Sequence, residues 1–575
     1  MLRRTALTGI LLACSLICAS LIGLSFETLQ RGLDRLVDDG SADFFSREVH
    51  LRFRIVVGIY GLAFLGAALA SFRRASMIRH DPENVPMNPR TRSPLPAFHR
   101  PFWIAVFVCS LLATGVRLIH LDQPMRYDEA YTYNTYISRG ILAAVSTYES
   151  PNNHLLNTLF SWGAVTAFGN SPSSLRLPAL LAGILCVAAS MMLANRIAGI
   201  RAAILAGFLI ALSSPLIEYS TNARGYTLLS LFTILAWLSA IDLIRHDRRG
   251  FRWILAVSIG CGIATIPLML FPLLMLGTWI GCLSWKSRDR VGIAHRILPS
   301  LLGGGTIAFV LYSPILIVTG PAEFLSNASG QKLGPPRPSS GNIHESIEQA
   351  CELLFRDIPW PILACLVVGV IAFCWRLTPL FRFGRVAALV SVVACFLPLI
   401  FLNSQPPPRV WLFLLPLFFI ACSCGGTWFI EAIEARIIRN GVTFILAAIL
   451  AVWPFIITTI RDSIRYSAET GAFPDAELIL NDLRPLLTDS DRIYAVGPAH
   501  AQLVYYGERM GIDRHQFPNV GEGGIPKGSL VILPNESGGT LDELLQKLSP
   551  SLRREEINFF REHTHWAIFR TQNAQ

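Results

Sequence analysis

The chain has 575 residues, of which 52% are hydrophobic and only 15% charged, and its formal net charge is +10. The mean hydropathy of +0.47 is too high for a soluble enzyme, and many apolar runs reach the ~18 to 20 residues that span a bilayer. Basic residues recur in short clusters between these runs, which argues against a nucleic-acid partner and is typical of the positive-inside pattern of a polytopic membrane protein.

Hydropathy and the charge bias together predict thirteen transmembrane helices and a cytoplasmic N-terminus. The predicted spans are 5–26, 53–72, 102–119, 176–195, 202–217, 226–244, 253–266, 269–285, 297–318, 359–375, 385–402, 410–430 and 442–460. An odd number of spans places the C-terminus outside. The first span also resembles a signal peptide, but its apolar run continues to Phe26, which favours a retained signal anchor.

Four regions follow from this organisation. We expect an N-terminal transmembrane hairpin over 1–72, a basic, proline-rich cytoplasmic linker over 73–100, a transmembrane body over 101–460 and a soluble extracytoplasmic domain over 461–575. Eleven of the twelve cysteines lie in predicted spans and Cys351 lies in an outer loop. No cysteine spacing matches a metal site, so we expect neither a disulfide framework nor a cysteine-ligated zinc.

The C-terminal region has the pattern of a small α/β domain. Buried strands are predicted at 492–496, 529–533 and 565–569, and helices at 475–487, 499–510 and 541–548. No glycine-rich phosphate loop follows any of these strands. The overall fold class expected is therefore an all-α polytopic membrane protein with a small α/β domain outside the membrane.

The outer loop between the third and fourth spans, about 55 residues long, carries the most informative residues. Asp128 and Glu129 are adjacent and follow the span 102–119 directly. A carboxylate just outside a span is well placed to take a proton from a group that meets a lipid-borne partner. Farther along, the segment 154–168 is apolar but short and interrupted by polar residues, so we expect it to lie along the membrane interface.

Several motifs occur in an order that resembles a known family. They are Asp128-Glu129, the run Ser150-Pro151-Asn152-Asn153-His154, Phe168-Gly169-Asn170-Ser171, Leu175-Arg176-Leu177-Pro178, Ser214-Pro215, the run Asn222-Ala223-Arg224-Gly225-Tyr226, and Gln405-Pro406-Pro407-Pro408-Arg409. Together they resemble the C-type membrane glycosyltransferases, in particular the protein O-mannosyltransferase-like and lipid A aminoarabinose transferase-like bacterial branch. The likeness covers about 101–430, and His154-Leu155 departs from the His-Pro that is more frequent in the family.

The resemblance implies transfer of a sugar from a polyprenyl-phosphate donor to an acceptor on the outer face of the membrane. It assigns Asp128 as the general base for the acceptor hydroxyl, and Glu129 as a catalytic-site residue that supports it. Because the leaving group is a phosphate, cationic side chains are needed to hold it, and Arg224 and Arg409 are the candidates. From sequence position alone, the carboxylate pair is also compatible with a solvated loop or a helix cap.

The remaining candidates for donor-phosphate binding each have a structural alternative. His154 either donates to the phosphate or caps the interfacial helix. Arg176 either binds phosphate or clamps that helix, Arg409 is also compatible with an interface anchor, and Tyr226 lies close to Arg224. Glu218 is at best a second acid.

Three further expectations concern ligands and alternatives. The first outer loop has no Asp-x-Asp pair, which favours a monophosphate donor without a metal, and no cofactor is expected. The loop 319–359 is either a lid or a plain connection. The alternative functions are a polymerase or ligase for diphosphate-linked glycans, or a lipid or glycan transporter. The acceptor can be a protein, a lipid glycan or an envelope polymer. The expected location of the protein is a bacterial inner membrane or its equivalent.

Overall fold

The computed structural model describes residues 2–34, 45–77, 98–246, 249–285, 289–328, 343–380, 384–397, 406–465, 467, 473, 475–495, 499–518, 525–526, 528–534, 545, 557–562 and 566–571. Most of the predicted linker, the central part of the predicted lid loop, Gln405 and nearly all of the predicted helix 541–548 lie outside these residues.

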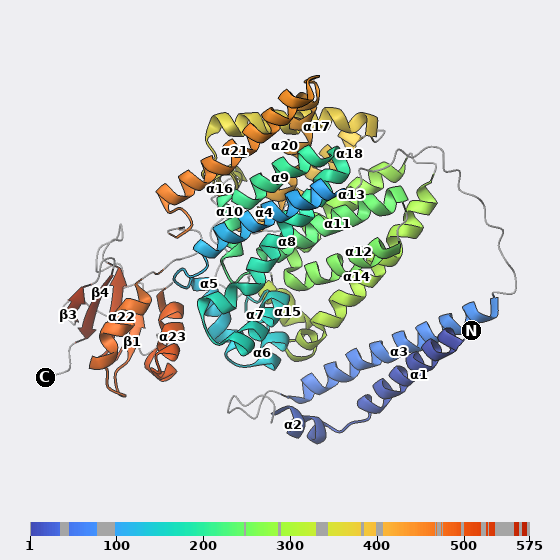
Figure 1. Ribbon diagram of the computed structural model, residues 1–575. Helices are drawn as coiled ribbons and strands as arrows, with labels where there is room; N and C mark the ends of the chain where they lie inside the picture. Colours follow the sequence, from blue (N-terminus) through green and yellow to red (C-terminus); the bar gives the residue numbers. More distant parts are fainter. Residues whose placement is uncertain are drawn as a thin grey trace.

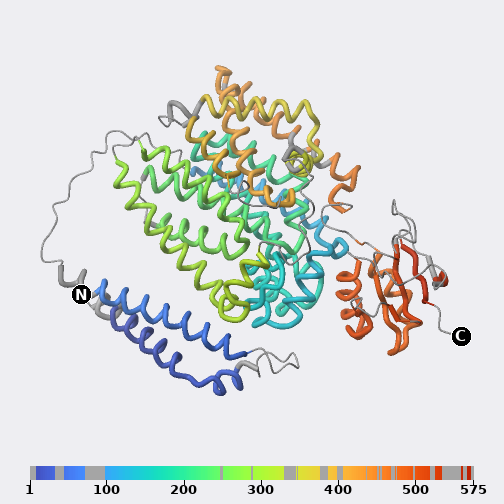
Figure 2. The backbone as a smooth tube through the Cα atoms, turned by 180° about the vertical axis from the view of Figure 1, so that it is seen from behind, coloured from blue at the N-terminus to red at the C-terminus, as the bar shows by residue number. Residues whose placement is uncertain are grey.

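The N-terminal helices form a hairpin that lies against one side of the helical body, away from the C-terminal domain (Figures 1 and 2). Its elements are α1 (Leu2–Ile22), α2 (Phe26–Asp34) and α3 (Arg47–Met77). The hairpin contacts the body through α14 (Arg290–Val318), where Arg52 Nη1 donates to the carbonyl of Val318 at 3.0 Å and Tyr60 packs edge-on against Phe309. The predicted hairpin 1–72 is therefore a packed helical unit.

The body is built from long apolar helices with short helices between them. In chain order they are α4 (Arg100–Ile119), α5 (Tyr127–Thr132), the π-helix η2 (Tyr133–Ile137), α6 (Ile141–Ser146), α7 (Leu155–Phe168), α8 (Pro172–Ala198), α9 (Ile200–Leu212), α10 (Ser214–Ser220), α11 (Tyr226–His246), α12 (Arg249–Thr265), η3 (Pro267–Met269), α13 (Leu270–Trp285), α14, α15 (Pro321–Ala328), α16 (Ile343–Leu354), α17 (Trp360–Leu380), α18 (Gly384–Phe396), η5 (Pro408–Phe413), α20 (Leu414–Glu431) and α21 (Arg436–Arg461). One apolar core joins α4, α8, α9, α11 and α20.

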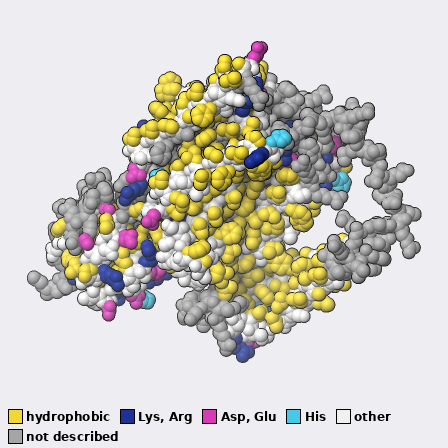
Figure 3. Space-filling model, in the orientation of Figure 1, with side chains coloured by type: hydrophobic (Ala, Val, Ile, Leu, Met, Phe, Trp, Pro, Cys, Tyr) yellow, Lys and Arg dark blue, Asp and Glu magenta, His cyan; other side chains and the backbone are white. Residues whose placement is uncertain are grey.

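Each predicted span overlaps a helix in the residues that the structure describes, although 398–402 lie outside them. The predicted span 5–26 is too long, because α1 ends at Ile22 and the chain bends by 100° before α2. Among the described residues, seven helices are long and apolar enough to cross a membrane, or nine if two bent pairs each count as one span. Shorter apolar helices within α12, α17, α18 and α21 account for the other four predicted spans. This is the all-α polytopic fold expected from the sequence, and apolar side chains cover most of the helical body in Figure 3. The predicted span 202–217, however, is not continuous: α9 and α10 meet at a bend of 62°, because Pro215 cannot continue the hydrogen bonds of α9.

The C-terminal domain contains a four-stranded sheet with helices against it (Figure 1). Its elements are α22 (Ala476–Leu483), η7 (Arg484–Leu486), β1 (Ile493–Ala495), α23 (Ala499–Arg509), η8 (Arg514–Gln516), β2 (Leu530–Pro534), β3 (Ile557–Glu562) and β4 (Trp566–Thr571). The strand order is β1-β2-β4-β3, with β1 parallel to β2 and the other pairs antiparallel. The α/β prediction is confirmed, and β3 is a strand that the sequence pattern did not reveal.

Candidate active site

The adjacent carboxylates lie in the first turn of α5, a short loop after the end of α4. Arg126 precedes this helix in an extended conformation, and the Glu129 carboxylate accepts the backbone N–H of Arg126 at 2.9 Å. This is the reach of a capping residue, which satisfies an N–H that the helix itself cannot pair. The next residues continue as the π-helix η2, a rare conformation that is frequent at functional sites.

Glu129 and Arg176 form a fully buried ion pair, each with 0% exposed side chain. The guanidinium donates to both carboxylate oxygens, at 2.8 and 2.7 Å. It also donates to the carbonyls of Leu121, Gln123 and Pro124, which form the segment entering α5. Burial tends to raise the pKa of Glu129, but the attraction and hydrogen bonds of Arg176, with the N–H of Arg126, outweigh it and hold the pKa below its usual value. This glutamate and this arginine therefore fasten the loop before α5 to α8 and are sealed from solvent.

Asp128 points to a different set of partners. Its Oδ1 accepts from the Asn152 amide at 3.0 Å. Its Oδ2 lies 3.7 Å from Arg224 Nη2 and 3.6 Å from Arg409 Nη2. The Asp128 side chain is 13% exposed and that of Arg409 is 21% exposed, whereas the Glu129–Arg176 pair is sealed. One partly accessible carboxylate is thus shared by two guanidinium groups that come from positions 185 residues apart.

His154 lies beside this cluster at the start of α7. The backbone N–H of Gly225 donates to His154 Nδ1 at 2.8 Å, and Arg224 Nη2 lies 3.3 Å from Nε2. A neutral imidazole accepts at one nitrogen only, so the Gly225 bond to Nδ1 places the ring proton on Nε2. There it faces an N–H group of Arg224, which is also a donor, so these two groups do not hydrogen-bond to each other. Burial, together with Arg224 and Arg409, holds the pKa of His154 well below its usual value. The ring is therefore neutral at neutral pH and presents an N–H donor beside the two arginines.

Tyr226 orders these cationic groups. Its hydroxyl accepts from Arg409 Nε at 3.2 Å. Its ring lies edge-on to His154, with centroids 5.0 Å apart, and the Arg224 guanidinium lies 5.8 Å from the ring centroid. Since Tyr226 opens α11 and Arg409 opens η5, the tyrosine joins two helices of the body to one cluster. All seven candidate residues from the sequence thus fall into two adjoining groups, a buried clamp of Glu129 with Arg176 and a cluster around Asp128.

A buried charge network supports the loop that leads into α5. The sequence analysis did not reveal most of this network. Glu218 on α10 has no exposed side-chain surface and pairs with Arg126 at 3.2 Å and with Arg356. Both glutamate oxygens are occupied by guanidinium groups, so Glu218 balances the charge of Arg126 and Arg356 in this buried network. No signal in the sequence joins Arg126 to Glu218, because they are 92 positions apart and no motif relates them.

The C-terminal domain also touches the loop. Tyr506 of α23 accepts the backbone N–H of Met125 at 3.0 Å, and Asn134 of η2 donates to the carbonyl of Ala501 at 2.9 Å. Tyr505 packs edge-on against Tyr133 with centroids 5.0 Å apart. One apolar cluster continues from the domain into the loop. The domain is thus part of the packing that positions α5, and its sequence carried no such indication.

No group of three or more His, Cys, Asp or Glu side chains suited to a metal ion occurs among the residues that the structure describes. The twelve cysteines are all free.

Comparison with known proteins gives a structural likeness alone. No protein-family model and no curated protein matches the chain. The structure is similar to that of ArnT from Cupriavidus metallidurans in the apo state, with 15% sequence identity, a TM-score of 0.55, and coverage of 81% of this chain and 97% of that one. ArnT bound to undecaprenyl phosphate matches with 15% identity, a TM-score of 0.49, and 82% and 98% coverage. The archaeal oligosaccharyltransferase AglB from Archaeoglobus fulgidus matches with 11% identity, a TM-score of 0.44, and 74% and 61% coverage.

The first of these likenesses shows a shared fold over nearly the whole of ArnT. The chain therefore shares the fold of ArnT, in agreement with the fold class expected from the sequence.

Proposed function

We propose that the protein is an integral membrane glycosyltransferase that moves a sugar from a polyprenyl-phosphate donor to an acceptor on the outer face of the membrane. One observation carries this proposal: Asp128 Oδ2 lies between the guanidinium groups of Arg224 and Arg409, at 3.7 and 3.6 Å, with the His154 N–H donor alongside. The fold shared with ArnT, a lipid A aminoarabinose transferase, supports the same class of reaction.

The charges of this cluster suit the proposed reaction. A sugar linked through polyprenyl phosphate is a phosphodiester with one negative charge, and the cluster of two guanidiniums and one carboxylate carries one positive charge. In the transfer, the acceptor oxygen bonds to the anomeric carbon and its proton passes to Asp128. The bond between that carbon and the phosphate oxygen breaks with its electron pair, which leaves a phosphomonoester with two negative charges.

Protonation of Asp128 raises the charge of the cluster to +2 in the same step. The attraction between the cluster and the phosphate thus grows as the leaving group forms, which is the condition for lowering the barrier rather than only binding the donor. His154 adds a neutral hydrogen-bond donor, and Tyr226 holds Arg409 in place. Glu129 and Arg176 act through the backbone of the loop, as positioning residues.

The orientation and the membrane are part of the proposal as well. The charge bias of the loops puts α5, the Asp128 cluster and the C-terminal domain on the extracytoplasmic side of a bacterial inner membrane or its equivalent. The expected partners are the polyprenyl-phosphate sugar, the membrane lipids and an acceptor that carries a hydroxyl or similar nucleophile.

The test is transfer or hydrolysis of a panel of labelled polyprenyl-phosphate sugars by the purified protein in lipid. We expect Asp128→Asn to lower turnover by ~10² to 10⁴, the usual contribution of a general base, and Arg224→Ala to lower it on a similar scale by loss of electrostatic stabilisation. Asp122→Asn is the matched control, because Asp122 is exposed on the same loop and should leave turnover unchanged.

Three outcomes would overturn the proposal. Full turnover in Asp128→Asn would remove the base assignment. A folded wild-type protein that consumes diphosphate-linked glycans and no monophosphate donor would point to a polymerase or ligase, and movement of lipid without any glycosyl transfer would point to a transporter.

A further inference from the structure

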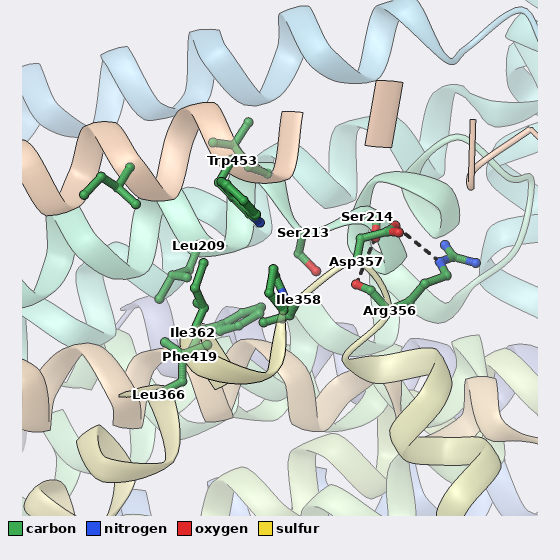
Figure 4. Close-up of a pocket in the computed structure, with 13 residues that line it drawn as sticks. Leu209, Ser213, Ser214, Arg356, Asp357, Ile358, Ile362, Leu366, Phe419 and Trp453 are labelled. Carbon is green, nitrogen blue, oxygen red and sulfur yellow. Dashed lines mark hydrogen bonds and ion pairs between the residues drawn. The ribbon is translucent and has the colours of Figure 1, made fainter. Parts of the chain in front are cut away.

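The pocket between α9, α17, α20 and α21 is too small to hold an organic ligand (Figure 4). Its free volume of about 30 Å³ has room for about two water molecules. The charged side chains that line it, Arg356 and Asp357, are paired with each other. The Asp128 cluster, in contrast, contains an amide side chain whose position determines how two opposite charges meet.

The side chain of Asn152 lies between Asp128 and Arg224. Its amide nitrogen donates to Asp128 Oδ1 at 3.0 Å, and its amide oxygen accepts from Arg224 Nη2 at 3.1 Å. The backbone carbonyl of Asn152 also accepts from Arg224 Nη1, at 3.3 Å. A carboxylate only accepts and a guanidinium only donates, so a single orientation of the amide suits both neighbours. Asn152 thus binds one oxygen of the carboxylate and both terminal nitrogens of the guanidinium.

These hydrogen bonds have no substitute among the residues that the structure describes. The Asp128 carboxylate accepts no other hydrogen bond there. His154 Nε2 lies 3.3 Å from Arg224 Nη2 but carries the ring proton, and Arg224 Nε has no partner. The backbone of Asn152 is itself held, because its N–H donates to the Ser150 hydroxyl at 3.3 Å. One asparagine therefore determines the position of both charged groups.

Asp128 and Arg224 are farther apart than a directly bonded pair. Arg224 Nη2 lies 3.7 Å from Asp128 Oδ2, whereas Arg176 reaches both oxygens of Glu129 at 2.8 and 2.7 Å. Two parallel hydrogen bonds are the strongest contact between a guanidinium and a carboxylate. The Asn152 amide occupies one oxygen and one nitrogen that such a contact would use. The pair of Asp128 and Arg224 is therefore held open.

We propose that Asn152 is a positioning residue that keeps the base and the phosphate ligand of the site apart. With the amide in place, Asp128 Oδ2 remains available to take the proton of the acceptor, and Arg224 remains available to the donor phosphate. Without it, Arg224 closes on Asp128, and each charge neutralises the group that the reaction needs. The effect on turnover rests on the proposed glycosyl transfer, but the contact with Asp128 does not depend on a substrate.

The first experiment measures turnover of a labelled polyprenyl-phosphate sugar by the purified protein in lipid. We expect Asn152→Ala to lower kcat by ~10², the effect of misplacing reacting groups, and to raise the KM of the donor. Its thermal transition should stay native-like, because the direct ion pair replaces the lost hydrogen bonds. Asn170→Ala is the matched control, since Asn170 is also half-buried and donates one hydrogen bond, to Tyr133 at 2.8 Å. Its kcat should not change.

The second experiment needs no activity. Asn152→Asp keeps the shape of the side chain but puts a carboxylate where Asp128 has its donor. Two carboxylates in contact share one proton, so the infrared band of the protonated carboxyl that Asp128→Asn abolishes should appear at a pH about one unit higher or more. The rise of turnover with pH should move in the same direction. Asn170→Asp adds the same charge beside Tyr133 and should leave the band in place.

Other charged and titratable groups face Asp128, but these variants leave them unchanged. Arg224 and Arg409 lie 3.7 and 3.6 Å from Oδ2. Burial and the charge of Asp128 raise the pKa of Tyr127 on α5, and the neutral His154 adjoins Arg224. A shift of the band between the wild type and Asn152→Asp therefore reports the substituted side chain.

The outcomes separate this inference from the proposed function. An unmoved band in Asn152→Asp, or full turnover in Asn152→Ala, would overturn the role of Asn152 while the wild type still transfers sugar. A much lower thermal transition in Asn152→Ala than in Asn170→Ala would also overturn it, because the amide would then only support the fold. A shifted band in a protein whose wild type transfers no sugar would confirm the bridge and overturn the proposed transfer.

Discussion

Glu129→Gln tests whether the loop that carries Asp128 depends on the buried pair of Glu129 and Arg176, the clamp of this site. The substitution keeps the shape of the side chain but removes the charge opposite Arg176. Both side chains have 0% exposure, so water cannot take over the lost interaction. Arg176 would keep its three carbonyl contacts to the segment entering α5, but its charge would be buried without a counter-ion.

The expected cost follows from this geometry. Removal of one partner from a fully buried, hydrogen-bonded ion pair typically costs about 3 to 5 kcal/mol. The glutamine amide oxygen can still accept the Ala223 N–H that Glu129 accepts at 2.6 Å. The amide nitrogen in place of Oε2, however, cannot accept from the Arg126 N–H and from Arg176 Nη2, so we expect the upper part of this range. Arg176→Met should cost a similar amount, because Glu129 is then left unpaired. The double variant leaves no unpaired charge and should lose about 2 to 3 kcal/mol less than the sum of the two single losses.

The free energies of unfolding of the four proteins can be measured by titration of mixed micelles with SDS, with tryptophan fluorescence as the signal. Arg139→Ala is a suitable control, because Arg139 is 45% exposed and its pair with Glu149 lies on the surface, where such pairs contribute about 0 to 1 kcal/mol. Losses that simply add, or a loss below about 1 kcal/mol for Glu129→Gln, would refute the clamp.

Three other predictions concern the surroundings of the site. Tyr506→Phe leaves the buried N–H of Met125 without its acceptor and should cost about 1 to 3 kcal/mol of stability; unchanged unfolding would show that the domain does not hold the loop. Gly225→Ala places a methyl group 2.5 Å from the Thr265 Cγ2 atom and 3.2 Å from His154, so we expect lower stability by about 1 to 3 kcal/mol together with lower sugar transfer, measured on the same preparation. The pKa of His154 is held low in the folded protein, so the unfolded chain binds more protons below pH about 6.5 and stability should fall there by up to about 1.4 kcal/mol per pH unit. His154→Gln should weaken that dependence, and equal pH slopes for both proteins would contradict the assignment.

The arrangement of helices could be predicted from the sequence because the bilayer imposes a length and a polarity on every span. The bend at Ser213 could not be read from hydropathy, since only Ser213 and Ser214 interrupt the apolar run 202–217. Its signal was Pro215, which occupies the first turn of α10 and is typical of a helix start. The strand β3 was missed because it pairs only with β4 at the edge of the sheet. There Phe559 is 61% exposed, so the alternation that marks a half-buried strand is weak.

The candidate site could be predicted only in part for a different reason. Local motifs gave Asp128, Arg224 and Arg409 because each stands next to a proline, a glycine or a second carboxylate with recognisable spacing. These three residues converge only in the tertiary structure, and the same is true of the pairs that Glu218 forms with Arg126 and Arg356. The paired residues are 92 to 281 positions apart in the sequence. A single sequence contains no record of such pairings.

Arg176, Arg224 and Arg409 differ less in burial than in how their charge is balanced. We use this difference to distinguish an arginine that holds the structure together from one that we propose binds the donor. Arg176 is matched by Glu129 and by three carbonyls. Arg224 and Arg409 share the one carboxylate of Asp128, at distances longer than a hydrogen bond. Arg224 is as buried as the structural arginines, with 3% of its side chain exposed, so exposure alone would have classed it with them. An anion that enters beside Asp128 meets two guanidinium groups, a buried one from Arg224 and a 21% exposed one from Arg409. This convergence is the physical reason why we propose the donor phosphate at these two arginines.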